Sequence, residues 1–124
     1  MAKTVTAAEM KERERAANEA GLLYIQMMEN AGRAAYAELK RRVPALRRLL
    51  IVAGKGNNGG DGFVMARVAA KEGVQVRVLL AEGEPKTADA KTNLARLGET
   101  AAEIVRDTEQ AAFGADAVVD ALYG

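Results

Sequence analysis

The sequence predicts an α/β protein, a three-layer Rossmann-like parallel sheet preceded by two N-terminal helices. Two observations support this fold class. Apolar segments of strand length alternate with helix-length segments over residues 47–124. A glycine-rich turn separates the first apolar run from a segment of helical periodicity. Because helix-length connections join parallel strands in right-handed crossovers, the sheet is expected to be parallel. A length of 124 residues corresponds to one domain, residues 1–124.

Residues 1–46 are predicted to form the two leading helices. The first runs from about Ala7 to Ala20, and Gly21 is expected to end it. The second runs from about Ile25 to Arg42 and carries apolar residues at helical spacing, which we interpret as core. These residues are Met27, Met28, Ala31, Ala34, Ala35 and Leu39. Glu29 lies within this stripe, where a charge needs a partner.

Residues 47–124 are predicted to form the alternating strands and helices. Strands are expected at Leu49–Ala53, Val74–Leu80, Ala102–Val105 and Ala117–Leu122. Helices are expected at about Gly60–Lys71, Thr87–Leu97 and Thr108–Phe113, and Asp61 is placed in the first turn of the first of these. Ligands of parallel sheets bind beyond the C-terminal ends of the strands. The glycine turn and Asp120 both follow such ends and are expected to converge on one pocket.

The composition excludes several kinds of chemistry. The chain has no Cys, no His and no Ser, which rules out thiolate and serine nucleophiles, zinc–cysteine sites and histidine bases. Carboxylates, Lys, Tyr and Thr remain as reactive side chains. The net charge of +1 gives no field that favours nucleic acid. No apolar run approaches the roughly 20 residues of a membrane span, so we expect a cytoplasmic protein with no nucleic-acid or membrane partner.

The glycine-rich turn, residues 54–62, has three interpretations from its residues alone. A hairpin turn is disfavoured, because the residues after it have helical rather than alternating periodicity. A dinucleotide fingerprint fits the spacing Gly54-x-Gly56-x-x-Gly59, with Glu82 as the acid that would bind a ribose. A P-loop is excluded, because no Gly-Lys-Ser/Thr closes the turn.

The full string Val-Ala-Gly-Lys-Gly-Asn-Asn-Gly-Gly-Asp-Gly-Phe-Val, residues 52–64, resembles the signature of the NAD(P)H-hydrate epimerases, the YjeF N-terminal domain family. Met28–Gly32 is similar to a helical motif of that family upstream of the first strand. Val118–Gly124 is similar to its later strand, which ends in an aspartate and a glycine-led loop. Family members continue beyond this point, so the resemblance implies a domain that is truncated at its C-terminus.

The resemblance implies a substrate, a metal and a reaction. The implied substrate-binding residues are Asn57, Asn58, Gly59, Gly60, Asp61 and Gly124. Asn58 and Asp120 would supply oxygens to a monovalent cation, K⁺, and oxygen donors suit a hard cation. The implied reaction is R-to-S epimerisation of NADH and NADPH hydrated at the nicotinamide ring (NADHX and NADPHX), a step in cofactor repair. No catalytic acid or base is assigned, because the family's further substrate-site aspartate would follow Gly124.

Two other functions stay open. One is a non-catalytic nucleotide-binding or scaffold module of the same fold. The other is a plain Rossmann dehydrogenase that uses Glu82 to bind the cofactor ribose. A strand that ends at the C-terminus would leave a sheet edge bare, and a bare edge tends to pair with another chain. We therefore expect a homo-oligomer, or a separate second half that completes the domain.

Overall fold

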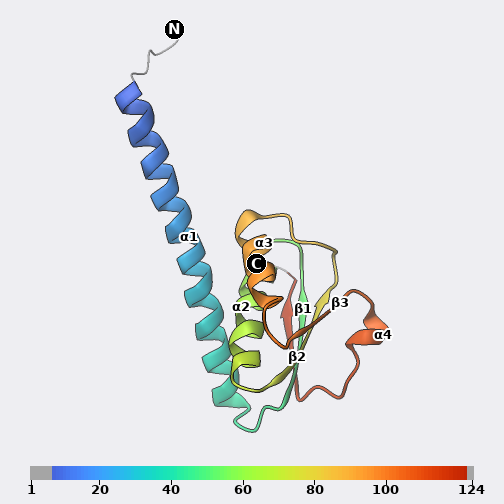
Figure 1. Cartoon of the computed structure of the whole chain (residues 1–124). Helices are drawn as coiled ribbons and strands as arrows, with labels where there is room; N and C mark the ends of the chain where they lie inside the picture. Colours follow the sequence, from blue (N-terminus) through green and yellow to red (C-terminus); the bar gives the residue numbers. More distant parts are fainter. Residues whose placement is uncertain (1–6, 123–124) are drawn as a thin grey trace.

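A computed structural model describes residues 7–122, without the side chains at positions 7, 9–11, 13, 14, 17 and 22. The described chain forms one sheet with helices around it (Figure 1). In chain order the elements are α1 (Ala7–Arg42), β1 (Arg48–Ala53), α2 (Asn57–Lys71), β2 (Gln75–Leu80), α3 (Ala88–Leu97), β3 (Glu103–Val105), α4 (Thr108–Ala111) and β4 (Ala117–Ala121). The predicted alternation of strands and helices after α1 is confirmed.

The sheet is parallel throughout, with strand order β3-β2-β1-β4. Leu49 of β1 lies opposite Val76 of β2 on one side and Ala117 of β4 on the other. The first three strands build outward in one direction, and the chain then returns to place β4 on the free side of β1. The strand order therefore reverses between β1 and β4, and such a switch point is where open α/β sheets bind ligands.

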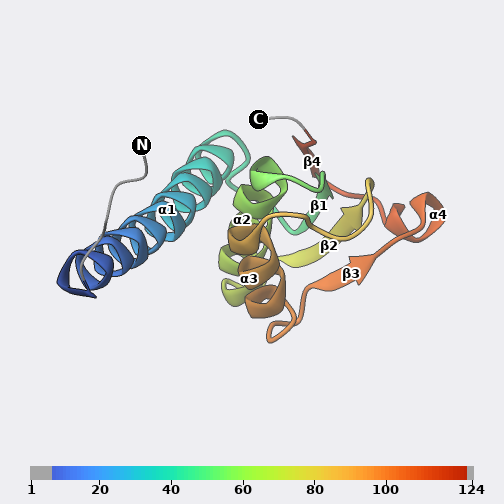
Figure 2. The same ribbon diagram turned by 90° about the horizontal axis from the view of Figure 1, so that it is seen from above.

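The two faces of the sheet are covered unequally. Helices α2 and α3 cover one face, and α1 packs on their outer side (Figure 2). The main core lies beneath α2, where Leu49 and Ile51 of β1 and Phe63 of α2 are fully buried. On the other face, α4 is the one described helix that contacts the sheet, and Val118 is 62% exposed there. The parallel α/β fold is confirmed, and within residues 7–122 its third layer consists of α4.

Helix α1 is a single helix of 36 residues, so the prediction of two N-terminal helices is wrong. Gly21 was expected to end the first helix, and glycines that end helices commonly have a positive φ. Among the described residues, the glycines with a positive φ are Gly73, Gly83 and Gly114. Glycine inside a helix costs only about 1 kcal/mol relative to alanine, and no proline occurs before Pro44. Good helix formers on both sides therefore carry the helix through Gly21.

The methionine and alanine stripe of α1 is mostly not core, which corrects a second prediction. Met28 and Tyr36 are buried, and Leu39 packs against the core. Met27 is 55% exposed, however. The alanines of the stripe are also exposed: Ala31, Ala34 and Ala35. The buried face of α1 repeats every four residues through Met28, Gly32 and Tyr36, and the predicted stripe runs beside it.

Two glycines allow α1 to approach α2 closely. A Cβ atom on Gly32 of α1 would lie 2.5 Å from Val64 Cγ1 and 2.9 Å from the carbonyl oxygen of Asp61. A Cβ atom on Gly60 of α2 would lie 2.6 Å from the Met28 sulfur. Real Cβ atoms do not come this close to other atoms, so a side chain at either position would displace the facing group. At Gly32 that group includes the backbone of α2, whereas at Gly60 it is the flexible end of Met28, so the contact depends most on Gly32.

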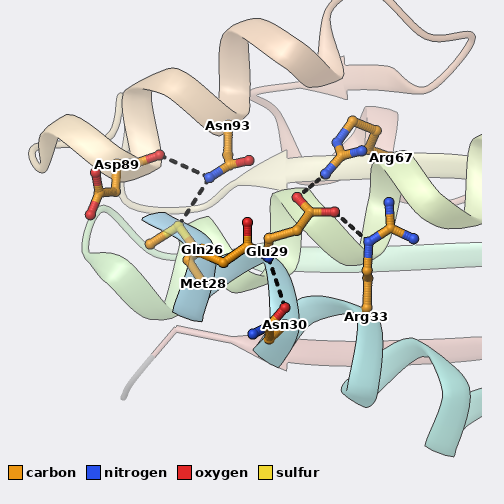
Figure 3. Close-up of polar contacts among 8 residues, drawn as sticks. All are labelled: Gln26, Met28, Glu29, Asn30, Arg33, Arg67, Asp89 and Asn93. Carbon is orange, nitrogen blue, oxygen red and sulfur yellow. Dashed lines mark hydrogen bonds and ion pairs between the residues drawn. The ribbon is translucent and has the colours of Figure 1, made fainter. Parts of the chain in front are cut away.

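A polar network holds the same helices together (Figure 3). Arg67 of α2 and Arg33 of α1 both donate hydrogen bonds to the Glu29 carboxylate. The side chains of Arg67 and Glu29 are only 9% and 15% exposed. Burial raises the pKa of Glu29, but the hydrogen bonds and charges of the two arginines outweigh it and hold that pKa below its usual value. Glu29 is thus paired, as its place in the sequence requires.

The third contact of this network reaches α3. The Asn93 amide donates to the Met28 sulfur, at 3.1 Å, and to the Asp89 carbonyl oxygen, at 3.1 Å. Asn93 is almost fully buried. One segment of α1, Met28 to Gly32, therefore contacts α2 and α3 together.

Replacing Gly32 with alanine is expected to destabilise the protein by about 1–2 kcal/mol, since overpacking at Val64 exceeds the gain in helix propensity. Gly21→Ala is the matched control, because nothing lies within 4 Å of the Cβ position there. That variant is expected to gain up to about 1 kcal/mol. Urea unfolding midpoints measure both. Equal stability of the two variants would contradict the close helix contact.

Glu29→Ala is expected to cost about 2–3 kcal/mol, because it leaves the buried Arg67 guanidinium without its carboxylate. Glu12→Ala, which removes an exposed ion pair with Arg15, should cost no more than about 0.5 kcal/mol. The folded-state pKa of Glu29 is depressed, so its stabilisation is present above the unfolded pKa and disappears as the pH falls through the folded pKa. The difference between wild type and Glu29→Gln should therefore shrink in acid. Chemical denaturation across pH tests this, and a constant difference would argue against the pair.

Candidate functional site

The site begins at the N-terminus of α2. This helix starts at Asn57, three residues before the predicted start, and its N-cap Gly56 makes no side-chain cap. No acidic side chain lies in the first turn, so the placement of Asp61 there is wrong. The first N–H groups of a helix have no partners within it and carry partial positive charge. An uncapped turn of this kind suits an anion such as a phosphate.

This helix start lies at the switch point of the sheet. The N–H of Gly54 donates to the carbonyl oxygen of Ala121, at 2.9 Å, so the glycine turn runs beside the end of β4. Asp120 pairs in register with Val52, the residue two before the turn. The turn and the end of β4 therefore meet, while the convergence of the turn and Asp120 on one pocket stays a prediction.

The glycines of the turn divide into two groups. A Cβ atom on Gly59 would clash with the carbonyl oxygen of Gly54, and one on Gly60 would clash with Met28. Both glycines are buried, and the chain itself fills the space that a side chain would need. Gly56, in contrast, has nothing within 4 Å of its Cβ position. The open side of the turn is thus at Gly56, while direct ligand contacts of Gly59 and Gly60 remain predictions.

Asn57 and Asp61 line a pocket of about 430 Å³, which we call the helix pocket. Its lining residues are Tyr24, Met27, Met28, Ala31, Asn57, Asp61 and Asp89. Helix α1 supplies the apolar wall, and the starts of α2 and α3 supply the polar rim. The α1 wall and Asp89 were not among the predicted site residues. The helical spacing of Met27, Met28 and Ala31 was the available signal, and the sequence predicted these residues to be core.

The Asp61 carboxylate is half-buried in this pocket and makes no hydrogen bond or ion pair within residues 7–122. Burial raises its pKa above the usual value. A carboxylate that is partly removed from water without compensation costs stability. Such a group, beside an uncapped helix start, is typical of a ligand-binding site.

Asp120 and Asn58 come from opposite sides of the switch point. Asp120 is exposed, on the sheet face away from α2, and its carboxylate accepts a hydrogen bond from the N–H of Leu122 at 3.0 Å. This is the loop-capping role open to any aspartate after a strand. Asn58 is half-buried in the first turn of α2. Gly124, the remaining predicted substrate residue, lies outside the described residues.

Glu82 has a structural role that the sequence did not indicate. Its carboxylate accepts a hydrogen bond from the N–H of Lys55, at 3.1 Å, and lies 2.5 Å from the Cβ position of Gly54. It therefore braces the glycine turn from the end of the neighbouring strand. A dehydrogenase would need this carboxylate for the cofactor ribose, so the contact disfavours that alternative.

The donor chemistry at the switch point suits a hard cation. The Asn58 amide and the Asp120 carboxylate offer oxygen atoms, the ligand type of K⁺. Within the described chain, no cluster of three or more His, Cys, Asp or Glu could hold a metal ion. Main-chain oxygens would have to complete the coordination. Separately, no described helix is long and apolar enough to cross a membrane.

Comparison with known proteins identifies the family. The profile described as "YjeF-related protein N-terminus" matches residues 24–124. The chain is 40% identical to the bifunctional NAD(P)H-hydrate repair enzyme Nnr of Moorella thermoacetica, over 97% of this chain and 25% of that protein. It is 35% identical to the NAD(P)H-hydrate epimerase of Rhodobacter capsulatus, over 100% of this chain and 63% of that protein.

A solved structure agrees with these relatives. The crystal structure of yeast YNL200c superposes with a TM-score of 0.68 at 26% identity, over 80% of this chain and 46% of the yeast chain. The chain thus spans less than two thirds of each of these relatives. With the matching fold, glycine turn and family profile, the chain belongs to the YjeF N-terminal domain family.

Proposed function

We propose that this chain contributes to the epimerisation of hydrated NADH and NADPH, R- to S-NAD(P)HX, in the repair of nicotinamide cofactors in the cytoplasm. One observation carries the proposal: the Asp61 carboxylate is half-buried close to the start of α2, and it has no hydrogen-bond or ion-pair partner within residues 7–122. The names of the relatives, NAD(P)H-hydrate epimerase and repair enzyme, support the choice of reaction.

The first turn of α2 would bind the diphosphate of the dinucleotide. Its N–H groups and partial positive charge attract phosphate oxygens, and the open side at Gly56 allows close approach. The amides of Asn57 and Asn58 add donors beside it. Gly59 and Gly60 allow the turn to lie close to Gly54 and Met28, so they would support the site without contacting the ligand.

Asp61 would hydrogen-bond the substrate from the helix pocket. Inversion at the hydroxyl-bearing carbon needs tight positioning and a group that holds a proton or stabilises a developing cation. Partial burial raises the pKa of Asp61 above its usual value, and its carboxylate would accept a hydrogen bond from the substrate. The apolar wall of Tyr24 and Met27 would exclude water from that side.

Asn58 and Asp120 would hold K⁺ at the switch point, with main-chain oxygens completing its shell. A cation there would supply positive charge beside the phosphates. The hydrogen bond from Leu122 would fix the Asp120 carboxylate in place. Residues that follow Gly124 in the longer relatives, or a second polypeptide, would complete the substrate site.

A second function is favoured by one observation. Within residues 7–122, no group of three or more His, Cys, Asp or Glu side chains could hold a metal ion. A module that binds the nucleotide without turnover would have this feature. Binding without epimerisation, by a folded chain, would select this function over the first.

Purified R-NADPHX is expected to convert to the S form with this chain in potassium buffer. Asp61→Asn should lower the affinity by about tenfold or more, because a hydrogen bond to a charged group is lost. Asp120→Ala should abolish the dependence on potassium. Glu99→Gln, an exposed change remote from the pocket, is the control. Chromatographic resolution of the two epimers measures turnover, and wild-type activity in Asp61→Asn would contradict the assigned role.

Asp61→Asn is also expected to raise stability at neutral pH. The folded-state pKa of Asp61 is raised, so the wild type loses stability as the pH rises through that pKa. Below the unfolded pKa both proteins should be equally stable. Urea midpoints at neutral and acidic pH measure the difference, and a variant less stable at neutral pH would show that the carboxylate has a structural partner.

A further inference from the structure

A second pocket, which we call the arginine pocket, is formed by the three helices α1, α2 and α3. It has a volume of about 530 Å³ and is lined by Ile25, Gln26, Glu29, Arg67 and Arg96. It shares no lining residue with the helix pocket. Two of its lining residues are cations that come from different helices, α2 and α3. This arrangement suits a negatively charged ligand.

Arg67 is buried in this pocket without using all of its hydrogen-bond donors. Its side chain is only 9% exposed. One terminal nitrogen, Nη2, donates to the Glu29 carboxylate (Figure 3). The Nε atom is buried and has no hydrogen-bond partner in the described chain. A buried donor without an acceptor is costly, and more so on a charged group, so this N–H group calls for an acceptor such as a bound ligand.

Arg96 supplies a second guanidinium to the same pocket. It lies in the last turn of α3 and is exposed. Within residues 7–122 its side chain makes no hydrogen bond or ion pair. Because Arg67 and Arg96 line one pocket, a single ligand can contact both of them.

The charges around the arginine pocket indicate the class of ligand. Arg33 and Arg67 both pair with Glu29, and Arg96 adds a third positive charge. Three positive charges and one negative charge leave an excess of two positive charges. A phosphate monoester carries a charge of about −1.5 to −2 at pH 7, and guanidinium groups bind phosphate oxygens with paired hydrogen bonds. A monovalent anion would neutralise only one of these charges.

We propose that the arginine pocket binds a phosphate group, either of a small organic molecule or as inorganic phosphate, between Arg67 and Arg96. The phosphate would accept the hydrogen bond of the Arg67 Nε–H group. This site is separate from the start of α2 and does not depend on the function proposed above.

A phosphate in this position would connect three helices. Glu29 and Arg67 already join α1 to α2, and a ligand held by Arg67 and Arg96 adds α3. The same segment of α1, residues 24–31, lines the arginine pocket and the helix pocket with alternate groups of side chains. Binding at the arginine pocket would therefore stabilise the α1 wall of the helix pocket.

Titration of the ¹⁵N-labelled chain with inorganic phosphate and, separately, with glycerol 3-phosphate tests the site at constant ionic strength in chloride. A saturable shift of the Arg67 Nε–H resonance is expected, with amide shifts at Gln26 and Arg96. A response to both compounds assigns the site to phosphate itself, and a response to the ester alone assigns it to an organic phosphate. Shifts confined to Gly56 to Asp61 overturn this proposal and leave the proposed function standing.

A matched pair of arginine variants tests whether the pocket, rather than general surface charge, binds the phosphate. Arg96→Gln should weaken binding by about tenfold, because charge-assisted hydrogen bonds are lost. Arg47→Gln removes another exposed arginine, which lines a different pocket, and should leave the affinity unchanged. Circular dichroism confirms that both variants fold. Equal affinities of the two variants, or no shift of the Arg67 resonance up to about 10 mM of either compound, overturn the proposal.

Discussion

The close contact between α1 and α2 is the constraint on which the rest of this structure depends. Gly32 rests against Val64 and the carbonyl oxygen of Asp61, and Gly60 makes room for Met28. The ion pair between Glu29 and Arg67 lies beside these glycines and is nearly buried. Without this contact, α1 would not form the apolar wall of the helix pocket, and Asp61 would face open solvent. A packing requirement thus creates the environment of the candidate site.

Sheet topology supplies the other half of the site. Because the strand order reverses between β1 and β4, the glycine turn runs beside the end of β4 at the switch point of the sheet. Glu82 braces this turn from β2, and Ala121 holds it from β4. The start of α2 is therefore held by neighbours on both sides, and its N-cap residue Gly56 provides no side-chain cap. A helix start of this kind is suited to bind a phosphate.

Much of this arrangement could be predicted from the sequence. The alternation of strands and helices predicted the parallel sheet. The glycine turn and Asp120 both follow strand ends, so they were expected to lie near each other. The continuity of α1 could not be predicted. A glycine costs a helix only about 1 kcal/mol, so the residues on both sides of Gly21 decide whether the helix continues. The sequence also could not show that Met28 is buried while Met27 is exposed. Two apolar faces on one helix overlap in the linear sequence, and only the position of α2 shows which is buried.

The central claim is that the start of α2, with Asp61 at the helix pocket, holds the dinucleotide. Titration of the ¹⁵N-labelled chain with NADPH, followed by amide chemical shifts, tests it most directly. The expected result is a saturable set of shifts centred on Gly56 to Asp61, strongly reduced in Asp61→Asn. Shifts confined to other parts of the molecule, or none at saturating nucleotide, would contradict the assignment of this site.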